Sequence, residues 1–413
     1  MNKTLKLAVA GAVLAMSSAA NAGIIIPAGD WTVDINGNVN AFYIHENGSD
    51  TNTVAGGLAR KRTAANTNGA NTSNINTGLL PSWFGVTGKK RENDLDISWT
   101  ISYQPGASTK NGLANNPAVG GGAGAEFRQA NMTIGDKSWG TIKLGKDLGL
   151  FGADAILNDQ TLLGVGATGG GASGTTTYGR IGTGFLYADF TGQIAYTSPN
   201  WNGFQFTAEI AQPWINANTM GYANTTASLV GNREPAFEGN VNYSWAGDVS
   251  GKIWLEGFTQ KVDNIATGGA LKRDRGNVYG IGGKVGFAGA ELVGYYYNGE
   301  GVGSTLLLDG GWDSQGNRRD SDGGYVQASY KIPNVGTKLA VSWGESNLDR
   351  SGSAGDLAAT TLLKSNQMWT AGVYHPLTSN VNLVAEYSRV ESENQAGATN
   401  KSDIFDLGAI LFF

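Results

Sequence analysis

The chain contains no cysteine and only 2 histidines among its 413 residues. Without cysteine there is no disulfide scaffold, no thiolate metal site and no cysteine nucleophile. Two histidines far apart in the sequence leave little for histidine-based metal binding or acid–base catalysis. We therefore expect a protein that is not an enzyme, with no catalytic residue, no bound metal and no cofactor.

Charge and long hydrophobic runs are also scarce. Charged residues make up 15% of the chain, against about 25% in an average soluble domain. The formal net charge of -5 argues against a nucleic-acid partner, because such proteins are normally basic. After residue 22 no uninterrupted apolar stretch reaches the roughly 20 residues of a membrane-spanning helix. A transmembrane β-barrel is still compatible, because its strands are only about 10 residues long and apolar at alternate positions.

What the chain has in abundance is glycine, with 63 residues, and aromatic side chains, with 11 Trp, 15 Tyr and 14 Phe. Hydrophobic residues make up 40%, which is enough to bury a core and argues against disorder. High glycine together with only 9 prolines is typical of a long chain of short strands and polar loops.

Residues 1–22 have the features of a secretory signal peptide. Lys3 and Lys6 form a basic start, an apolar run follows from Leu5 to Met16, and Ala20-Asn21-Ala22 is a small-x-small cleavage site. We expect cleavage after Ala22 and export of an acidic protein. Residues 23–413 show no linker or composition shift, so we expect them to form one domain.

Strict alternation begins at the first strand expected after the cleavage site, Trp31–Tyr43. Its odd positions are apolar apart from Gly37, with an aromatic at each end, and its even positions are polar apart from Phe42. Aromatics at both ends of an apolar face are typical of strands that cross a membrane. Comparable alternation predicts sixteen strands, at 31–43, 82–91, 94–104, 125–135, 139–147, 190–199, 202–212, 236–246, 250–262, 276–288, 290–299, 323–333, 336–346, 365–376, 380–392 and 402–413.

The connections between these strands alternate in length. Tight turns such as Glu92-Asn93-Asp94 follow one end, and long loops rich in Gly, Asn, Thr and Ser, such as 44–81, 148–189 and 263–275, follow the other. This sorting predicts an all-β, antiparallel, up-and-down transmembrane barrel with one long-loop rim. Sixteen strands enclose a lumen too wide for side chains to fill, so we expect an aqueous channel.

Three stretches carry a resemblance to a known family. They are the strand Trp31–Tyr43, the stretch Trp139–Lys146 followed by Gly149-Leu-Phe-Gly-Ala-Asp154, and the terminal Leu411-Phe412-Phe413. With the element order of the whole chain, they resemble the general porins of Gram-negative outer membranes. The resemblance implies a homotrimer, lodged in a lipid bilayer with lipopolysaccharide, that passes small hydrophilic solutes and ions by passive diffusion. It also implies insertion by the outer-membrane barrel assembly machinery, which reads the last strand and its Phe413.

In that family the third long loop folds into the lumen and narrows it, with acidic residues facing basic residues on the opposite wall. By analogy, Asp154 and Asp159 belong to the constriction formed by 148–189. Parity places Lys143 and Lys89 on the lumenal face. Arg128 shares the parity of Ala130 and Met132, so it either lines the pore or faces the trimer interface. The full set of expected pore-wall residues is Lys143, Lys89, Asn38, Asn40, Gln129, Arg128 and Arg180. Asn38, Asn40 and Gln129 are uncharged where the family has arginines, so ion preference stays open.

Other interpretations remain. A substrate-selective porin for sugars or carboxylates would need lumenal aromatics, for which Trp83, Trp254 and Phe258 have the right parity. The long loops also allow a secondary role in adhesion. The acidic residues of 309–322 leave open a divalent-cation site, although their order is not that of a calcium loop. The glycines of 164–169 fit a dinucleotide-binding pattern, but no strand–helix unit surrounds them, so a loop is expected.

Overall fold

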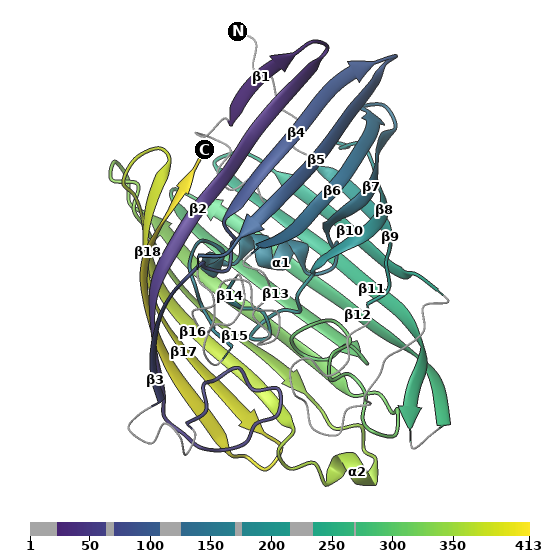
Figure 1. Ribbon diagram of the computed structural model, residues 1–413, viewed down its shortest axis with the longest axis vertical. Coiled ribbons are helices and arrows are strands. Elements are labelled where there is room, and N and C mark those ends of the chain that lie inside the picture. The colour runs from purple at the N-terminus through teal and green to yellow at the C-terminus, as the bar shows by residue number, and fades with distance from the viewer. Residues whose placement is uncertain (1–22, 63–69, 108–124, 170–175, 215–233, 268–269) are drawn as a thin grey trace.

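The computed structural model describes residues 23–62, 70–107, 125–169, 176–214, 234–267 and 270–413. The expected signal peptide, 1–22, lies outside these residues. Within them, sixteen long antiparallel strands form a barrel (Figure 1). The barrel strands are β2 (Trp31–Gly48), β4 (Trp83–Glu92), β5 (Leu95–Pro105), β6 (Ala125–Asp136), β7 (Gly140–Leu148), β8 (Phe190–Thr197), β9 (Phe204–Ala211), β10 (Ala236–Trp245), β11 (Val249–Thr267), β12 (Ala270–Phe287), β13 (Ala290–Glu300), β14 (Asp320–Lys331), β15 (Lys338–Leu348), β16 (Leu363–Pro376), β17 (Val381–Asn394) and β18 (Thr399–Phe412).

The barrel closes where the last strand meets the first. β18 pairs with β2 in the register Leu411↔Val39, and Phe413 exchanges backbone hydrogen bonds of 2.9 and 3.0 Å with Gly37. A short strand, β1 (Ile24–Ala28), pairs with the start of β2 on the side of β18. Another, β3 (Ala70–Asn76), pairs with the far half of β2. Closure satisfies the backbone groups that an open sheet edge would leave unpaired in a bilayer.

The alternation of the sequence becomes the two faces of the barrel wall. On β2, Val39 is 60% exposed on the outer face, whereas Asn38 and Asn40 are 2% exposed inside. Large apolar side chains are exposed on the outside of strand after strand, for example Ile253 and Leu255 on β11 and Leu407 and Leu411 on β18. An outer surface of this kind is stable against lipid tails and would aggregate in water. No helix among the described residues is both long and apolar enough to span a membrane.

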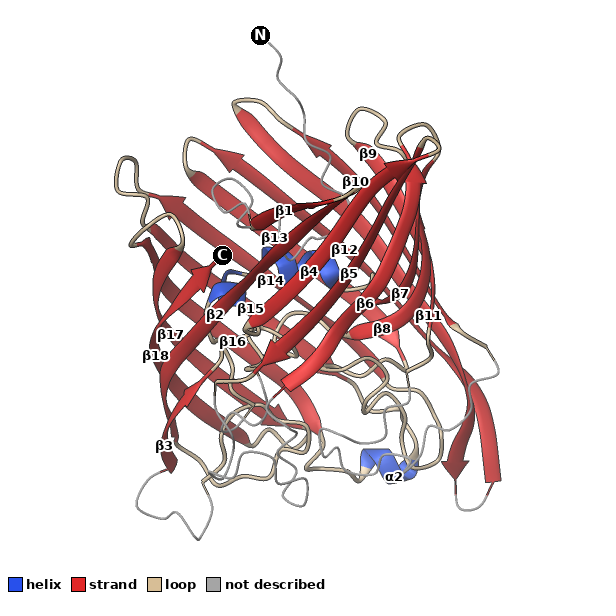
Figure 2. Cartoon of the chain, turned by 45° about the horizontal axis from the view of Figure 1, so that its top comes forward, coloured by secondary structure: helices blue, strands red, loops and turns tan. Residues whose placement is uncertain are grey.

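Tight turns and long loops separate to opposite ends, as the alternating connection lengths predict (Figures 1 and 2). The turn between β4 and β5 places Asn93 and Asp94 at φ of 48° and 62°. Two successive residues with positive φ match the twist of a two-residue hairpin, and Asn and Asp tolerate that conformation better than most residues. The C-terminus lies towards the tight-turn end and α2 (Ala354–Leu357) lies at the long-loop end.

Two expectations about the long loops are wrong. The connection expected at 263–275 is mostly strand, because β11 and β12 extend to Thr267 and Ala270 with an irregularity between Val262 and Ile265. The connection expected at 44–81 contains β3. The missed strand segments include Asp263-Asn264 on β11 and Ala70–Asn76 on β3, which are largely polar. Their pattern lacks alternation because strand ends beyond an apolar layer have no face that must be apolar.

Candidate pore and its third loop

The third long loop, between β7 and β8, runs inside the barrel. It forms α1 (Ala153–Asn158) and the short 3-10 helix η4 (Gln160–Leu163), and Figure 2 shows α1 within the barrel at mid-height. Asp159 begins η4, where its side chain accepts a hydrogen bond of 3.1 Å from the Thr161 N–H. Phe151, Ala155 and Val165 are completely buried, so the loop packs against the wall as a folded element.

Carboxylates on the inner wall hold the backbone of this loop. Glu238 Oε2 accepts hydrogen bonds from the Leu150 and Phe151 N–H groups at 2.8 and 2.6 Å. Glu256 Oε1 accepts from the Gly152 N–H at 3.0 Å. These hydrogen bonds satisfy N–H groups that no helix or sheet pairs.

The same arrangement recurs further along the loop. Glu386 Oε2 accepts from the Val165 and Gly166 N–H groups at 2.9 and 3.0 Å. The close approach requires glycine at position 164, because a Cβ there would overlap the Glu386 carboxylate. Glu46 Oε2 accepts from the Thr168 hydroxyl at 2.7 Å. We call Glu46, Glu238, Glu256 and Glu386 the loop-holding carboxylates. The glycine-rich stretch 164–169 is therefore a loop, as expected, and it is shaped to fit this wall.

Neutral groups complete the attachment. Gln327 accepts a hydrogen bond from the Gln160 N–H at 2.7 Å and donates to the Asn158 carbonyl at 3.1 Å. The Tyr325 hydroxyl donates to the Ala155 carbonyl at 2.8 Å. The wall residues come from β10, β11, β14, β17 and β2 in turn, so the loop follows more than half of the inner circumference.

The two acids expected at the constriction lie in different surroundings. Asp154 forms an ion pair with Lys252 of β11 and accepts a hydrogen bond of 3.1 Å from Asn240, and it stays partly exposed. Asp159 is completely buried and lies 3.7 Å from the guanidinium Nε of Arg180, which is also completely buried. Burial raises the pKa of the Asp159 carboxyl and lowers that of the Arg180 guanidinium, and their mutual attraction opposes both shifts.

Arg180 therefore joins the two limbs of the loop to the wall. Its guanidinium donates to the Met368 carbonyl at 3.0 Å and to the Ser342 hydroxyl. Removing one member of such a buried pair leaves an uncompensated charge, which is strongly destabilising. The sequence placed Arg180 in the return part of the loop; its contact with Asp159 was not foreseen.

Lys143 and Gln129 lie together on the inner face, as their parity predicts. The Lys143 ammonium lies 2.6 Å from Asp147, whose other oxygen accepts a hydrogen bond of 2.7 Å from Gln129. Lys89 is exposed towards the tight-turn end of β4 and does not join this group. Asp147 neutralises Lys143, so these two side chains do not form a one-sign patch.

Asn38 and Asn40 are inward but covered. Asn38 donates to the Pro81 carbonyl and Asn40 to the Leu80 carbonyl, both at 3.0 Å, and Asn40 accepts from the Gly78 N–H at 3.0 Å. Their amides therefore fasten the segment 77–82, which precedes β4, to the inside of the wall. The segment shields both side chains from the lumen.

Of the two orientations left open for Arg128, the structure shows the one towards the pore. The register between β5 and β6 shifts between Ser102 and Gln104, so parity reverses beyond the irregularity. Arg128 faces inward: its Nε lies 2.8 Å from Glu126, and its guanidinium carbon lies 5.4 Å from the centre of the Phe190 ring. A β-bulge of this kind carries no clear sequence signal here, so alternation alone could not have found it.

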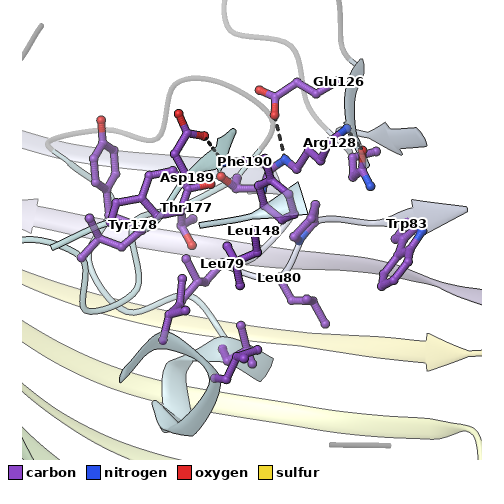
Figure 3. Close-up of a pocket in the computed structure, with 18 of the residues that line it drawn as sticks. Leu79, Leu80, Trp83, Glu126, Arg128, Leu148, Thr177, Tyr178, Asp189 and Phe190 are labelled. Carbon is purple, nitrogen blue, oxygen red and sulfur yellow. Dashed lines mark hydrogen bonds and ion pairs between the residues drawn. The ribbon is translucent and has the colours of Figure 1, made fainter. Parts of the chain in front are cut away.

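A cavity of about 270 Å³ lies between the third loop and the wall formed by β4, β5 and β6 (Figure 3). Leu79 and Leu80 border it from the segment 77–82, and Ile156 and Leu162 border it from the third loop. Arg128, Glu126 and Asp189 are the charged residues among the described residues that line it.

The aromatic residues with lumenal parity do not form an open track. Trp254 stacks on Tyr295 with ring centres 6.4 Å apart, and Tyr295 contacts Tyr325 at 6.1 Å. All three are at most 4% exposed, because the third loop covers them. Phe258 is buried in the same core, whereas Trp83 lines the cavity. A sugar could not slide along this covered cluster.

The acidic loop residues of 309–322 bond to neighbouring loops. Asp313 accepts hydrogen bonds of 2.6 Å from the Ser351 and Ser353 hydroxyls, and Arg319 forms a buried ion pair of 2.5 Å with Asp356. Burial raises the pKa of Asp313, but these hydrogen bonds and those from Asn317 together outweigh burial and lower the pKa to about 2. The described residues contain no group of three or more acidic or histidine side chains placed to hold a metal ion.

Sequence reasoning missed the loop-holding carboxylates, together with Asp147, Asp189 and Lys252. One signal was available, since Glu238 and Glu256 occupy inward positions of expected strands. Their function could not be inferred, because it depends on a loop about 90 to 220 residues away in the sequence.

Comparisons with known proteins agree with this architecture. A sequence search of curated proteins found no match. The family model described as Gram-negative porin matches residues 8–395. The structure is similar to the outer membrane channel DcaP of Acinetobacter baumannii, with a TM-score of 0.66 and 14% identity over 95% of this chain and 100% of that one.

Two further structures share the fold. The anion-selective porin from Comamonas acidovorans has a TM-score of 0.58 and 15% identity over 93% of this chain and 100% of that one. The trimer form of OmpT, an outer membrane protein of Vibrio cholerae, has a TM-score of 0.53 and 15% identity over 93% and 99%. The family model spans most of the sequence and the fold is a closed sixteen-stranded barrel, so the chain belongs to the Gram-negative porin family and is an outer-membrane channel protein.

Proposed function

We propose that this porin lets small hydrophilic solutes and ions diffuse passively across the outer membrane, past a constriction formed by its third loop. One observation carries the proposal. The loop is fastened to more than half of the inner wall, and the cavity lies between it and the remainder. A folded element that occupies part of a water-filled barrel sets the cross-section that a solute must pass.

The charged side chains near this passage suggest which residues determine ion selectivity. Asp154 is the partly exposed acid of the loop, and its partner Lys252 and the inward Lys143 provide positive charge nearby. Charged side chains in a narrow lumen act at short range, where salt screens them little. We assign Asp154, Lys143 and Arg128, each as one member of an ion pair, to ion selectivity, and Asp159 and Arg180 to folding of the loop. Lys89 belongs to the wider mouth, and Asn38, Asn40 and Gln129 support the wall.

The assembly follows by analogy with the family. We propose a homotrimer, in line with the trimer form of the OmpT neighbour, in contact with lipid and lipopolysaccharide. We further propose export by a signal peptide cleaved after Ala22, a single domain over 23–413, and barrel insertion by the assembly machinery that reads the terminal Phe413. The pairing of Phe413 with Gly37 at the closing seam makes the last residue a sensible place for such a signal.

Single-channel recording tests the function directly. The refolded protein, without residues 1–22, is added to a planar bilayer, and current is recorded in symmetric KCl and then under a KCl gradient. We expect ohmic openings in groups of three, and a reversal potential that shifts in Asp154→Asn but not in Asp94→Asn, a fully exposed turn residue with the same charge change. An absence of current from folded protein would contradict the proposal.

A further inference from the structure

The cavity between the third loop and β4–β6 is lined differently from a simple water-filled passage. Leucine and isoleucine side chains from three separate segments border it, including Leu306 from the loop before β14. Trp83, Tyr178 and Tyr187 add aromatic surface. A hydrated ion gains nothing from such a lining, whereas an apolar group does, at about 25 cal/mol for each Å² removed from water.

The size of the cavity selects for small organic molecules. Engineered apolar cavities of about 150 Å³ take up benzene, so a cavity of about 270 Å³ has room for one ring and a compact head group. It lies just below the usual range of small-molecule sites, about 300 to 1,000 Å³.

The charges that line the cavity favour one sign. Arg128 is already engaged, by Glu126 at 2.8 Å and by the face of Phe190. The remaining charge is that of Asp189, whose Oδ1 accepts a hydrogen bond of 2.7 Å from the Phe190 N–H. Burial raises the pKa of Tyr187 to about 12, which keeps that phenol neutral. The described lining therefore holds two carboxylates and one guanidinium, a net negative charge that Lys146 nearby offsets in part. Aromatic faces beside Asp189 also attract cations.

We propose that this cavity is a binding subsite for organic monocations that carry one small apolar ring. The ring lies among the leucines and the aromatic side chains, and the cationic group lies beside Asp189. Because it names a solute class for the same passage, this inference rests on the proposed channel function. It predicts that ring-bearing cations interact with the channel more strongly than ring-bearing anions of equal size.

The test compares benzyltrimethylammonium, benzoate, benzyl alcohol and tetramethylammonium as blockers of single-channel KCl current. The same four compounds are titrated against the folded trimer in detergent by isothermal calorimetry, which reports binding whether or not current flows. We expect benzyltrimethylammonium to bind about tenfold more tightly than each of the other three. A higher affinity than that of tetramethylammonium measures the contribution of the ring. A higher affinity than that of benzyl alcohol measures the contribution of the positive charge.

Variants assign the effect to residues. Asp189→Asn removes the charge, keeps an acceptor for the Phe190 N–H, and suits the φ of 49° at this position. It should weaken benzyltrimethylammonium about tenfold and leave benzyl alcohol unchanged, while Asp94→Asn should change neither. Leu306→Ser, at a partly buried lining residue, should weaken both ring compounds by about the same factor.

The outcomes separate the two proposals. Benzoate binding as tightly as benzyltrimethylammonium, or unchanged affinity in Asp189→Asn, would overturn the subsite. Normal KCl conductance without block or calorimetric binding would overturn the subsite and leave the channel function standing. Binding with the expected preference in protein that passes no current would uphold the subsite and contradict the channel function.

Discussion

Two pairs of hydroxyls show how differently the two halves of the inner wall are used. Thr370 and Ser388 face each other across β16 and β17, with oxygens 2.8 Å apart, and are completely buried. Thr87 and Thr100 face each other across β4 and β5 in the same way, 3.0 Å apart, and are partly exposed. Both pairs have inward parity, so parity determines that the side chains point into the barrel. The third loop determines which of these inward side chains are exposed to water.

In the half of the wall that the third loop covers, carboxylates accept hydrogen bonds from the loop backbone. There the acids have N–H partners, which offset the loss of water. On the open half, charges pair with one another along the wall, as Lys143 does with Asp147. The same residue type therefore holds the loop on one side and sets the local field on the other.

Removing the hydrogen bonds between the third loop and the wall should have the largest effect on the single-channel current. Glu386→Ala removes two hydrogen bonds to the loop, each worth about 1 kcal/mol. The loop segment near Val165 should detach part of the time, and single-channel recordings should show larger and noisier currents. Gly164→Ala disturbs the same contact from the loop side and should act in the same direction.

Glu291 provides the matched control for this change. It is an inward carboxylate on β13, half-buried, near the tight-turn end and away from the third loop. Glu291→Ala should leave current noise as in the unaltered protein. If Glu386→Ala behaved like Glu291→Ala, the carboxylates would not be what holds the loop.

The next effect concerns the charge of the loop itself. Lys252→Gln removes the partner of Asp154 and frees that carboxylate to act on passing ions. We expect the reversal potential to shift in the direction of greater cation selectivity, with the cation-to-anion permeability ratio rising roughly twofold or more. Lys284 lies directly opposite Lys252 on β12, so Lys284→Gln removes equal charge and controls for the general loss of a cation.

Equal shifts in the two lysine variants would mean that Asp154 gains no influence when it is released. The double variant Lys252→Gln with Asp154→Asn sharpens the test. It should return the reversal potential most of the way to that of the unaltered protein, because both partners of the pair are then neutral.

How much of this arrangement follows from the sequence can be argued residue by residue. Alternation predicted the sixteen strands and the inward direction of Lys143, Asn38 and Asn40, because a one-residue slip would put polar groups against lipid. It left the direction of Arg128 open, because strict parity turns this residue outward and the bulge opposite Ser102–Gln104 reverses that parity. It could not foresee that Asn38 and Asn40 are covered, because the covering segment 77–82 is not a strand and shows no alternation. Its position depends on its hydrogen bonds to these two side chains.

The third loop was the least predictable part. Its position was expected from the family resemblance, but its contacts join Val165 to Glu386 and Arg180 to Met368, pairs of residues far apart in the sequence. Such contacts depend on the closed barrel, which brings the loop after β7 against β16 and β17. Local patterns contain no information about them until the barrel is closed.

A smaller effect belongs to the open half and depends on pH. Burial raises the pKa of Asp189, although the Phe190 N–H, Arg128 and Lys146 oppose the shift. Asp189 therefore takes up its proton at a higher pH than an ordinary aspartate does. Block by benzyltrimethylammonium, whose own charge does not titrate, should weaken as the pH falls, at a higher pH than an ordinary aspartate would give. In Asp189→Asn this pH dependence should be absent, and a retained dependence would assign it to another group.

The smallest expected effect is at the mouth, where further loops cover the barrel. Asp313, with its pKa lowered to about 2, is ionised in the folded loops at a pH where an exposed aspartate is already protonated. Its hydrogen bonds to Ser351 and Ser353 therefore stabilise the loops fully above about pH 4. This contribution is lost progressively as the pH falls towards 2, because the unfolded loop then binds the proton more readily than the folded one. The protection factors of residues 309–319 against hydrogen exchange, which are corrected for the intrinsic pH dependence of exchange, should fall over this interval, while those of β17 stay constant. Asp313→Asn should already exchange faster at pH 7 and lose the acid dependence; if it kept that dependence, the acid sensitivity of the mouth would have to come from a group other than Asp313.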